Sequence, residues 1–210
     1  MTSSYRSFFT REHVRSLLVA LVMLGLAVVF QFYASIYSER VPSNSVPDLL
    51  LSILPVVNVN FLIVEGALLA IAGTIVLLLA KPKYLIFSLK AAAIFIATRA
   101  VFVSVTHLGI YPGQINPGTD FWDSIYTGLG LEAGFFFSGH TGLTFLMMLI
   151  FWKDKFWRYV YLVLCVLFAF GVLLAHVHYS IDVLAAPYIT YTIYKISQYF
   201  FPEDYKLAIS

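Results

Sequence analysis

Long apolar runs constrain this chain more than any other feature of its sequence. Six runs approach or exceed the roughly 20 residues that a helix needs to cross a bilayer. They lie at about residues 14–34, 57–80, 84–106, 137–152, 157–175 and 181–200. With 60% hydrophobic and only 11% charged residues, the chain cannot cover a soluble globule with polar side chains. We therefore expect an all-α membrane protein whose six transmembrane helices form one domain over residues 1–210.

The segments between these runs leave no room for a second, soluble domain. The first run is too long for a signal peptide, so we interpret it as a retained span. Leu49–Pro55 is apolar but too short to span, which favours an interfacial or re-entrant helix. The longest connection, residues 107–136, is rich in Gly, Pro and aromatic residues and could cover a site. The single cysteine, Cys165, excludes an intramolecular disulfide.

Basic residues predict how the chain sits in the membrane, because flanking Lys and Arg are retained in the cytoplasm. In the six-span topology, eleven of the 13 basic residues fall on the side of the two termini. We therefore expect cytoplasmic termini. The other connections should face the extracellular, periplasmic or lumenal side. No basic cluster suggests a nucleic-acid partner, and no pattern indicates an oligomeric state.

Two short motifs place histidines at apolar helix starts. Residues 138–141 read Ser-Gly-His-Thr, and residues 178–182 read His-Tyr-Ser-Ile-Asp. His178 follows His140 by 38 residues, about the length of one helix down, a short turn and one helix back. Both histidines should therefore return to the non-cytoplasmic face. If the last helix starts early enough, Asp182 shares a face with His178 and can accept a hydrogen bond from its imidazole.

This trio suits displacement at phosphorus. We predict that His178 attacks as nucleophile, that Asp182 orients it, and that His140 donates a proton to the departing oxygen. A simpler interpretation is that the histidines only cap helix ends and meet water. A metal site built from His176, His178 and Asp182 is another alternative, but their spacing matches no metal motif, and we predict neither a metal nor a cofactor.

Two ionisable residues, Glu65 and Arg99, fall inside apolar runs, where a charge is costly and is usually paired or functional. Both lie roughly 10 Å from the outer boundary, so they could form an ion pair. Arg99 could instead reach a lipid phosphate, with Thr106 two turns above it. His107, Asp120, Asp123, Glu132 and His176 are weaker candidates.

The two motifs resemble the catalytic signature of the sphingomyelin synthase family, within the type 2 phosphatidic acid phosphatase (PAP2) superfamily. Val46-Pro47-Asp48, the Arg99–Thr106 spacing and Tyr188-Ile189-Thr190 also resemble that family. The resemblance implies six spans, a site facing the lumen or exterior, and transfer of a phospho-headgroup from a glycerophospholipid to ceramide. It implies the same three roles for His178, Asp182 and His140. We also predict substrate or phosphate contacts by Arg99, Ser138, Gly139, Thr141 and Tyr179, with Glu65 and Thr106 in support.

The sequence departs from both branches of that superfamily. Residues 132–134 read Glu-Ala-Gly where sphingomyelin synthases usually carry Cys-Gly-Asp. Arg99 precedes alanine rather than the proline of the classical phosphatases, and position 172 holds valine instead of their arginine. We expect transfer between a phospholipid donor and a lipid acceptor, ceramide or diacylglycerol. The alternatives are hydrolysis by a lipid phosphatase or phospholipase C, and a non-enzymatic lipid-binding protein.

Overall fold

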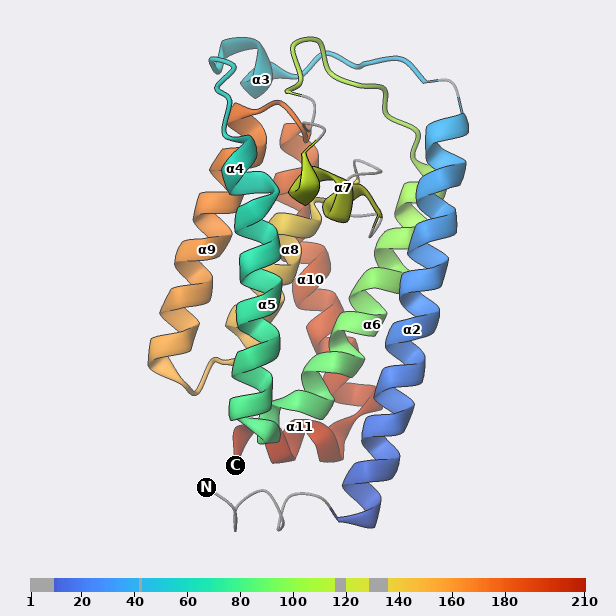
Figure 1. The fold of residues 1–210 in the computed structure, drawn as a ribbon, viewed down its shortest axis with the longest axis vertical. Helices are drawn as coiled ribbons and strands as arrows, with labels where there is room; N and C mark the ends of the chain where they lie inside the picture. The colour runs from blue at the N-terminus through green and yellow to red at the C-terminus, as the bar shows by residue number, and fades with distance from the viewer. Residues whose placement is uncertain (1–9, 42, 116–119, 129–135) are drawn as a thin grey trace.

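The long helices run between the same two ends of a bundle (Figure 1). The computed structural model describes residues 10–41, 43–115, 120–128 and 136–210, and all regular structure in them is helical. The helices are α2 (Arg11–Arg40), α3 (Leu49–Ile53), α4 (Asn60–Ile63), α5 (Glu65–Ala80), α6 (Pro82–Val105), α7 (Phe121–Gly128), α8 (Gly139–Ile150), α9 (Lys155–Leu174), α10 (Ser180–Phe200) and α11 (Pro202–Ile209). We call the two ends of the bundle the α3 end and the α11 end. The start of α2 and the C-terminus both lie at the α11 end (Figure 1).

Four of the described helices are long and apolar enough to cross a membrane. They are Arg11–Arg40, Asn60–Ala80, Pro82–Val105 and Lys155–Leu174. These helices indicate a multi-pass integral membrane protein. The expected spans 14–34, 57–80, 84–106 and 157–175 each correspond to one of them, although the second begins at Asn60, after the separate short helix α3.

The expected spans at 137–152 and 181–200 do not meet that criterion. Helix α8 has only 12 residues, about 18 Å of helix, which is less than the hydrocarbon thickness of a bilayer. It is largely buried and packs against α6, α9 and α10, so protein surrounds it. Helix α10 has 21 residues, but Asp182, Lys195 and several tyrosines lower its hydropathy. Six spans are therefore not confirmed, and four of the described helices meet the length and hydropathy that a span requires.

Local sequence signals set several helix boundaries. Asp48 caps α3 by accepting the backbone N–H groups of Leu50 and Leu51. Ser138 caps α8, and Asp154 caps α9. Such side chains satisfy backbone donors that have no partner inside the helix. The starts of α3, α8 and α9 are thus fixed by side chains close to them in the sequence.

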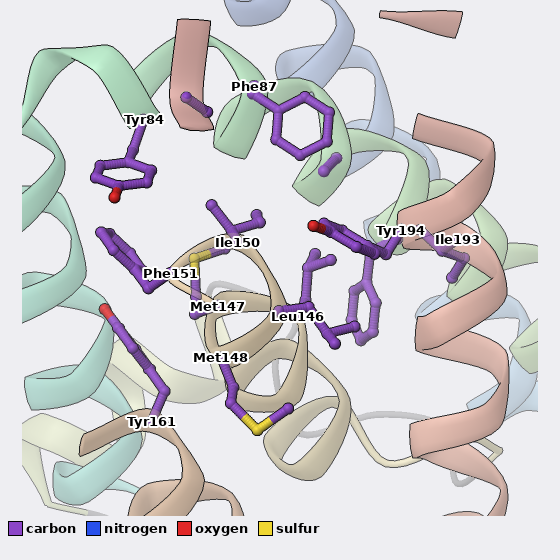
Figure 2. Packing of buried hydrophobic residues seen from close by; sticks show 14 of the residues in the cluster. Tyr84, Phe87, Leu146, Met147, Met148, Ile150, Phe151, Tyr161, Ile193 and Tyr194 are labelled. Atoms are coloured by element: carbon purple, nitrogen blue, oxygen red, sulfur yellow. The ribbon is translucent and has the colours of Figure 1, made fainter. Parts of the chain in front are cut away.

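Buried aromatic and aliphatic side chains hold α8 against its neighbours (Figure 2). Leu146 is fully buried, and Phe151 stacks on Tyr161 of α9 with ring centroids 5.6 Å apart. Gly142 lets α8 approach Phe95 of α6 closely. This packing fixes the axis of α8 and hence the direction in which its first turn points.

Polar contacts fasten the α11 end. Lys90 of α6 pairs with Asp204 of α11 at 2.6 Å and also donates to Ser16 of α2. Lys81 and Asp154 form a second ion pair at 2.5 Å between the α5–α6 and α8–α9 turns. These contacts connect helices far apart in sequence at the end opposite the two motifs.

Candidate active site

The first turns of α8 and α10 are joined directly at the α3 end of the bundle. The backbone N–H of Ser138 donates to the carbonyl oxygen of Asp182 at 3.1 Å. This bond brings together the Ser-Gly-His-Thr and His-Tyr-Ser-Ile-Asp motifs, which lie at the amino ends of the two helices.

His178 and Asp182 form a buried pair. Nδ1 of His178 lies 3.2 Å from Oδ2 of Asp182, which also accepts the backbone N–H of Tyr179 at 2.9 Å. The pairing geometry differs from our expectation, because α10 begins at Ser180 and His178 precedes it. Asp182 reaches back across the helix start as part of a capping box, rather than sharing a helix face with His178. A carboxylate at Nδ1 fixes the tautomer and leaves Nε2 as the nitrogen that faces away from Asp182.

His140 lies next to this pair. Its ring centroid is 6.2 Å from that of His178, and the two rings are nearly perpendicular. Nε2 of His140 lies 3.1 Å from the carbonyl oxygen of Ile63 and 3.1 Å from the hydroxyl of Tyr126. Since a carbonyl only accepts, the contact with Ile63 fits a tautomer that carries hydrogen on Nε2.

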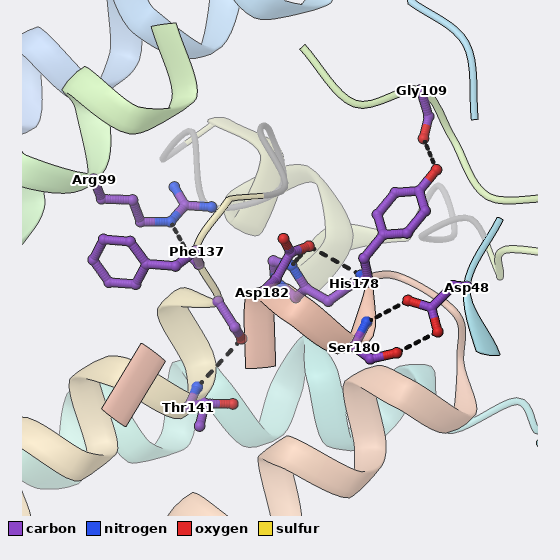
Figure 3. A network of polar contacts seen from close by, with 10 residues as sticks. Asp48, Arg99, Gly109, Phe137, Thr141, His178, Ser180 and Asp182 are labelled. Carbon is purple, nitrogen blue, oxygen red and sulfur yellow. Dashed lines mark hydrogen bonds and ion pairs between the residues drawn. The ribbon is translucent and has the colours of Figure 1, made fainter. Parts of the chain in front are cut away.

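Arg99 lies beside the first turn of α8. Its Nε donates to the carbonyl oxygen of Phe137 at 3.1 Å, and a Cβ on Gly139 would lie 3.4 Å from Nε (Figure 3). The absence of a side chain at Gly139 therefore allows this close approach. Arg99 is buried, with 7% of its surface exposed.

Residues 134–199 match the family described as PAP2 superfamily C-terminal. This match supports the PAP2 superfamily. The matched segment, here called the PAP2 region, contains His140, His178 and Asp182. It suggests a lipid-related phosphatase or phosphotransferase function. No curated protein gives a significant match to the chain.

Glu65 and Arg99 do not form the ion pair that the sequence left open. Both residues are described by the structure, and none of its ion pairs joins them. Oε2 of Glu65 is buried without a hydrogen-bond partner at the start of α5. Thr106 is the C-cap of α6, seven residues beyond Arg99. Arg99 instead contacts the Phe137 carbonyl beside the first turn of α8.

Hydroxyl groups of the two motifs have different environments. Ser138 Oγ accepts the backbone N–H of Thr141 at 3.4 Å. The Tyr179 hydroxyl donates to the carbonyl of Gly109 at 2.7 Å. These two bonds hold the residues that directly follow the two histidines in the sequence. The hydroxyl of Thr141 is buried without a hydrogen-bond partner.

The weaker candidates lie apart from the three central residues or have structural contacts. His107 packs its ring against Tyr37, and Asp120 caps the start of α7. Asp123 accepts a hydrogen bond from Asn60 at 3.2 Å. Glu132 lies outside the described residues.

His176 is buried, adopts a left-handed backbone with φ of 57° and packs on Tyr111. Neither of its ring nitrogens has a hydrogen-bond partner. It does not join His178 and Asp182 in a cluster, since no group of three or more His, Cys, Asp or Glu within the described ranges could hold a metal ion.

Sequence reasoning missed three contacts of the site. Tyr126 was one of several aromatics in the outer connection, and nothing in the sequence separated it from the others. The Ile63 carbonyl belongs to the backbone and carries no sequence signal. Asp48 precedes an apolar stretch, as an N-cap does, but its hydrogen bonds to Ser180 are long-range.

Proposed function

We propose that this protein is a lipid phosphotransferase that moves a phospho-headgroup from a glycerophospholipid to a lipid hydroxyl, such as that of ceramide or diacylglycerol. The proposal rests on the arrangement of His140 and His178, whose ring centroids lie 6.2 Å apart. One of them, His178, contacts the buried carboxylate of Asp182. At this separation both rings can reach one phosphoryl group. The match of residues 134–199 to the PAP2 superfamily supports the same chemistry.

In the first proposed step, the lone pair on Nε2 of His178 attacks phosphorus. The bond between phosphorus and the diacylglycerol oxygen breaks, and that oxygen takes a proton from protonated His140. Asp182 keeps its hydrogen bond to Nδ1 of His178 and stabilises the positive charge that develops on the ring. The products are diacylglycerol and a phosphohistidine that carries the headgroup.

In the second proposed step, neutral His140 removes the proton from the acceptor hydroxyl. The acceptor oxygen bonds to phosphorus, the N–P bond breaks, and the electron pair returns to Nε2 of His178. His140 is then protonated again, so the two histidines are restored and no net proton is consumed.

Positive groups around the histidines suit an anionic phosphate. Arg99 lies beside Gly139, and His140 lies in the first turn of α8, where the helix dipole favours negative charge. A bound phosphate would in turn favour the protonated form of His140, because an opposite charge nearby stabilises the imidazolium.

The experiment that tests the function uses purified protein in detergent with a fluorescent ceramide and mixed phospholipids, with His178→Ala as the matched inactive variant. We expect a new phosphosphingolipid that the variant does not make. Diacylglycerol or dephosphorylated lipid without that product would show that the protein hydrolyses its substrate instead of transferring the headgroup to a lipid. A wild-type protein with no product from any donor and acceptor, ceramide and diacylglycerol included, would support the non-enzymatic alternative.

We also propose that the α11 end faces the cytoplasm and the α3 end the opposite side. Lys81, Lys90 and Lys206 all belong to contacts at the α11 end. Because the only cysteine is buried, a membrane-impermeant maleimide should report single introduced cysteines cleanly. In sealed right-side-out vesicles, Leu49→Cys should react and Lys206→Cys should react only after permeabilisation. The reverse pattern would invert the orientation.

A further inference from the structure

Asp48 joins two segments that are far apart in the sequence. Its Oδ1 accepts the backbone N–H groups of Leu50 and Leu51 at 3.0 and 3.1 Å, which caps α3. Its Oδ2 accepts the backbone N–H of Ser180 at 2.7 Å, and Oδ1 also accepts the Ser180 hydroxyl (Figure 3). One carboxylate therefore caps α3 and also binds the first residue of α10, which lies 132 positions later.

Tyr179 makes a second connection at the same place. Its side chain is 1% exposed, and its hydroxyl donates to Gly109 O and accepts the backbone N–H of Val46 at 3.3 Å. Gly109 itself donates to the carbonyl of Asn44 at 3.1 Å. A Cβ at Gly109 would lie 2.6 Å from the Asn44 carbonyl carbon, so the two segments touch through their backbones.

Each of the three consecutive residues 178–180 is thus held by a different part of the chain. His178 contacts Asp182, the Tyr179 side chain holds residues 46 and 109, and Ser180 binds Asp48. The first N–H groups of a helix have no partner inside it. At the start of α10, Asp182 satisfies the N–H of Tyr179, and Asp48 satisfies that of Ser180. The backbone that carries His178 is held on its carboxyl side by two carboxylates from different segments.

We propose that Asp48 is a positioning residue, which fixes the backbone at Ser180 and thereby the ring of His178 relative to His140. The physical reason is that a displacement of about 1 Å in a reacting group can cost roughly 10²-fold in rate. Without the Asp48 carboxylate, the chain just after His178 loses two of its hydrogen bonds, while Asp182 alone cannot hold Ser180.

The charge of Asp48 strengthens this anchor. Burial alone would raise the pKa of the Asp48 carboxyl, but hydrogen bonds from Ser180, Leu51 and Leu50 outweigh it and leave the pKa below its ordinary value. The group is therefore ionised at neutral pH, and bonds to an ionised acceptor are stronger than bonds to a neutral one.

The test compares Asp48→Asn with Asp154→Asn. Asp154 is a matched control because it also caps a helix, accepting Trp157 N–H, but it lies in the α8–α9 turn at the α11 end. Two quantities are measured in each purified variant: amide hydrogen exchange in a peptide covering Tyr179–Asp182, and kcat and KM with the lipid substrates. Melting temperatures are recorded so that loss of folded protein is not mistaken for loss of rate.

We expect Asp48→Asn to speed exchange in the Tyr179–Asp182 peptide at least about tenfold and to lower kcat by roughly 10- to 100-fold, with little change in KM. Ser180→Ala keeps its backbone N–H and should show a smaller effect of the same kind. Asp154→Asn should change neither quantity, although it lowers the melting temperature. Unchanged exchange, or an unchanged kcat in Asp48→Asn, would overturn the positioning role.

The kinetic half of this inference rests on the proposed function, whereas the exchange half does not. If the wild-type protein converts no lipid, the proposed function fails, and hydrogen exchange still decides whether Asp48 holds the start of α10. If the wild-type protein is active and Asp48→Asn matches it in both quantities, the positioning role alone fails.

Discussion

Oδ2 of Asp182 lies 3.2 Å from Nδ1 of His178 and 2.9 Å from the backbone nitrogen of Tyr179, so one oxygen contacts both the ring and the chain beside it. The residue is fully buried. A carboxylate in this position contacts the imidazole directly and also holds the backbone of the next residue. Because it is buried, solvent screens its charge poorly. The proposed nucleophile should therefore depend strongly on the charge of Asp182.

Replacing Asp182 by Asn tests that dependence. Asn keeps the size and one acceptor oxygen but removes the negative charge that stabilises a positively charged ring. We expect kcat for lipid conversion to fall by roughly 10²- to 10⁴-fold with little change in KM. The measurement is steady-state kinetics on protein whose melting temperature matches the wild type. A decrease below about threefold would contradict the orienting role.

Replacing Tyr126 by Phe should have a smaller effect. The change removes the hydroxyl 3.1 Å from Nε2 of His140, but the Ile63 carbonyl still contacts that nitrogen. One hydrogen bond contributes about 1 kcal/mol, so we expect less than about a tenfold loss in kcat. His140→Ala, measured in parallel, should lose far more. Equal losses in the two variants would mean that the phenol is as important as the imidazole.

A side chain at Gly142 should destabilise the protein. A Cβ there would lie 2.7 Å from two ring carbons of Phe95 and 3.0 Å from the Thr190 hydroxyl. We expect Gly142→Ala to lower the free energy of unfolding by about 1–3 kcal/mol through overpacking. Gly73→Ala is the matched control, because a Cβ at Gly73 meets nothing within 4 Å. It should be neutral or stabilise by up to about 1 kcal/mol. Thermal unfolding in detergent measures both, and a stable Gly142→Ala protein would refute the close approach.

The ion pair of Lys90 and Asp204 should contribute to stability without affecting chemistry. Its side chains are only 7% and 12% exposed, so removing one partner leaves a poorly solvated charge. We expect Asp204→Asn to destabilise by about 3–5 kcal/mol and the double variant Lys90→Met/Asp204→Leu to recover much of that loss. Below the melting temperature, kcat should be unchanged, since the pair lies at the end opposite the histidines. A double variant no more stable than Asp204→Asn would argue against the pair.

Much of the helical architecture could be predicted because a helix that crosses lipid must be long and apolar. Four of the expected apolar runs correspond to helices long and apolar enough to span, since a span must be continuous and apolar. The runs at 137–152 and 181–200 are not confirmed as spans, and for α8 the physical reason lies in its packing. A short apolar helix that is buried by neighbouring helices has the same composition as one that faces lipid, so hydropathy cannot separate α8 from a span.

The candidate site was also predictable only in part from the sequence. The sequence determined that His140 and His178 lie close to the starts of two helices, because their polar neighbours interrupt apolar runs and helix length brings both back to one end. It also placed Asp182 within reach of His178, since four residues is a local distance. The tertiary structure alone decided that Arg99 contacts the Phe137 carbonyl rather than Glu65, and that Asp48 holds Ser180. These contacts join residues 38 and 132 positions apart, and such distances depend on how whole helices pack, which no local pattern of residues encodes.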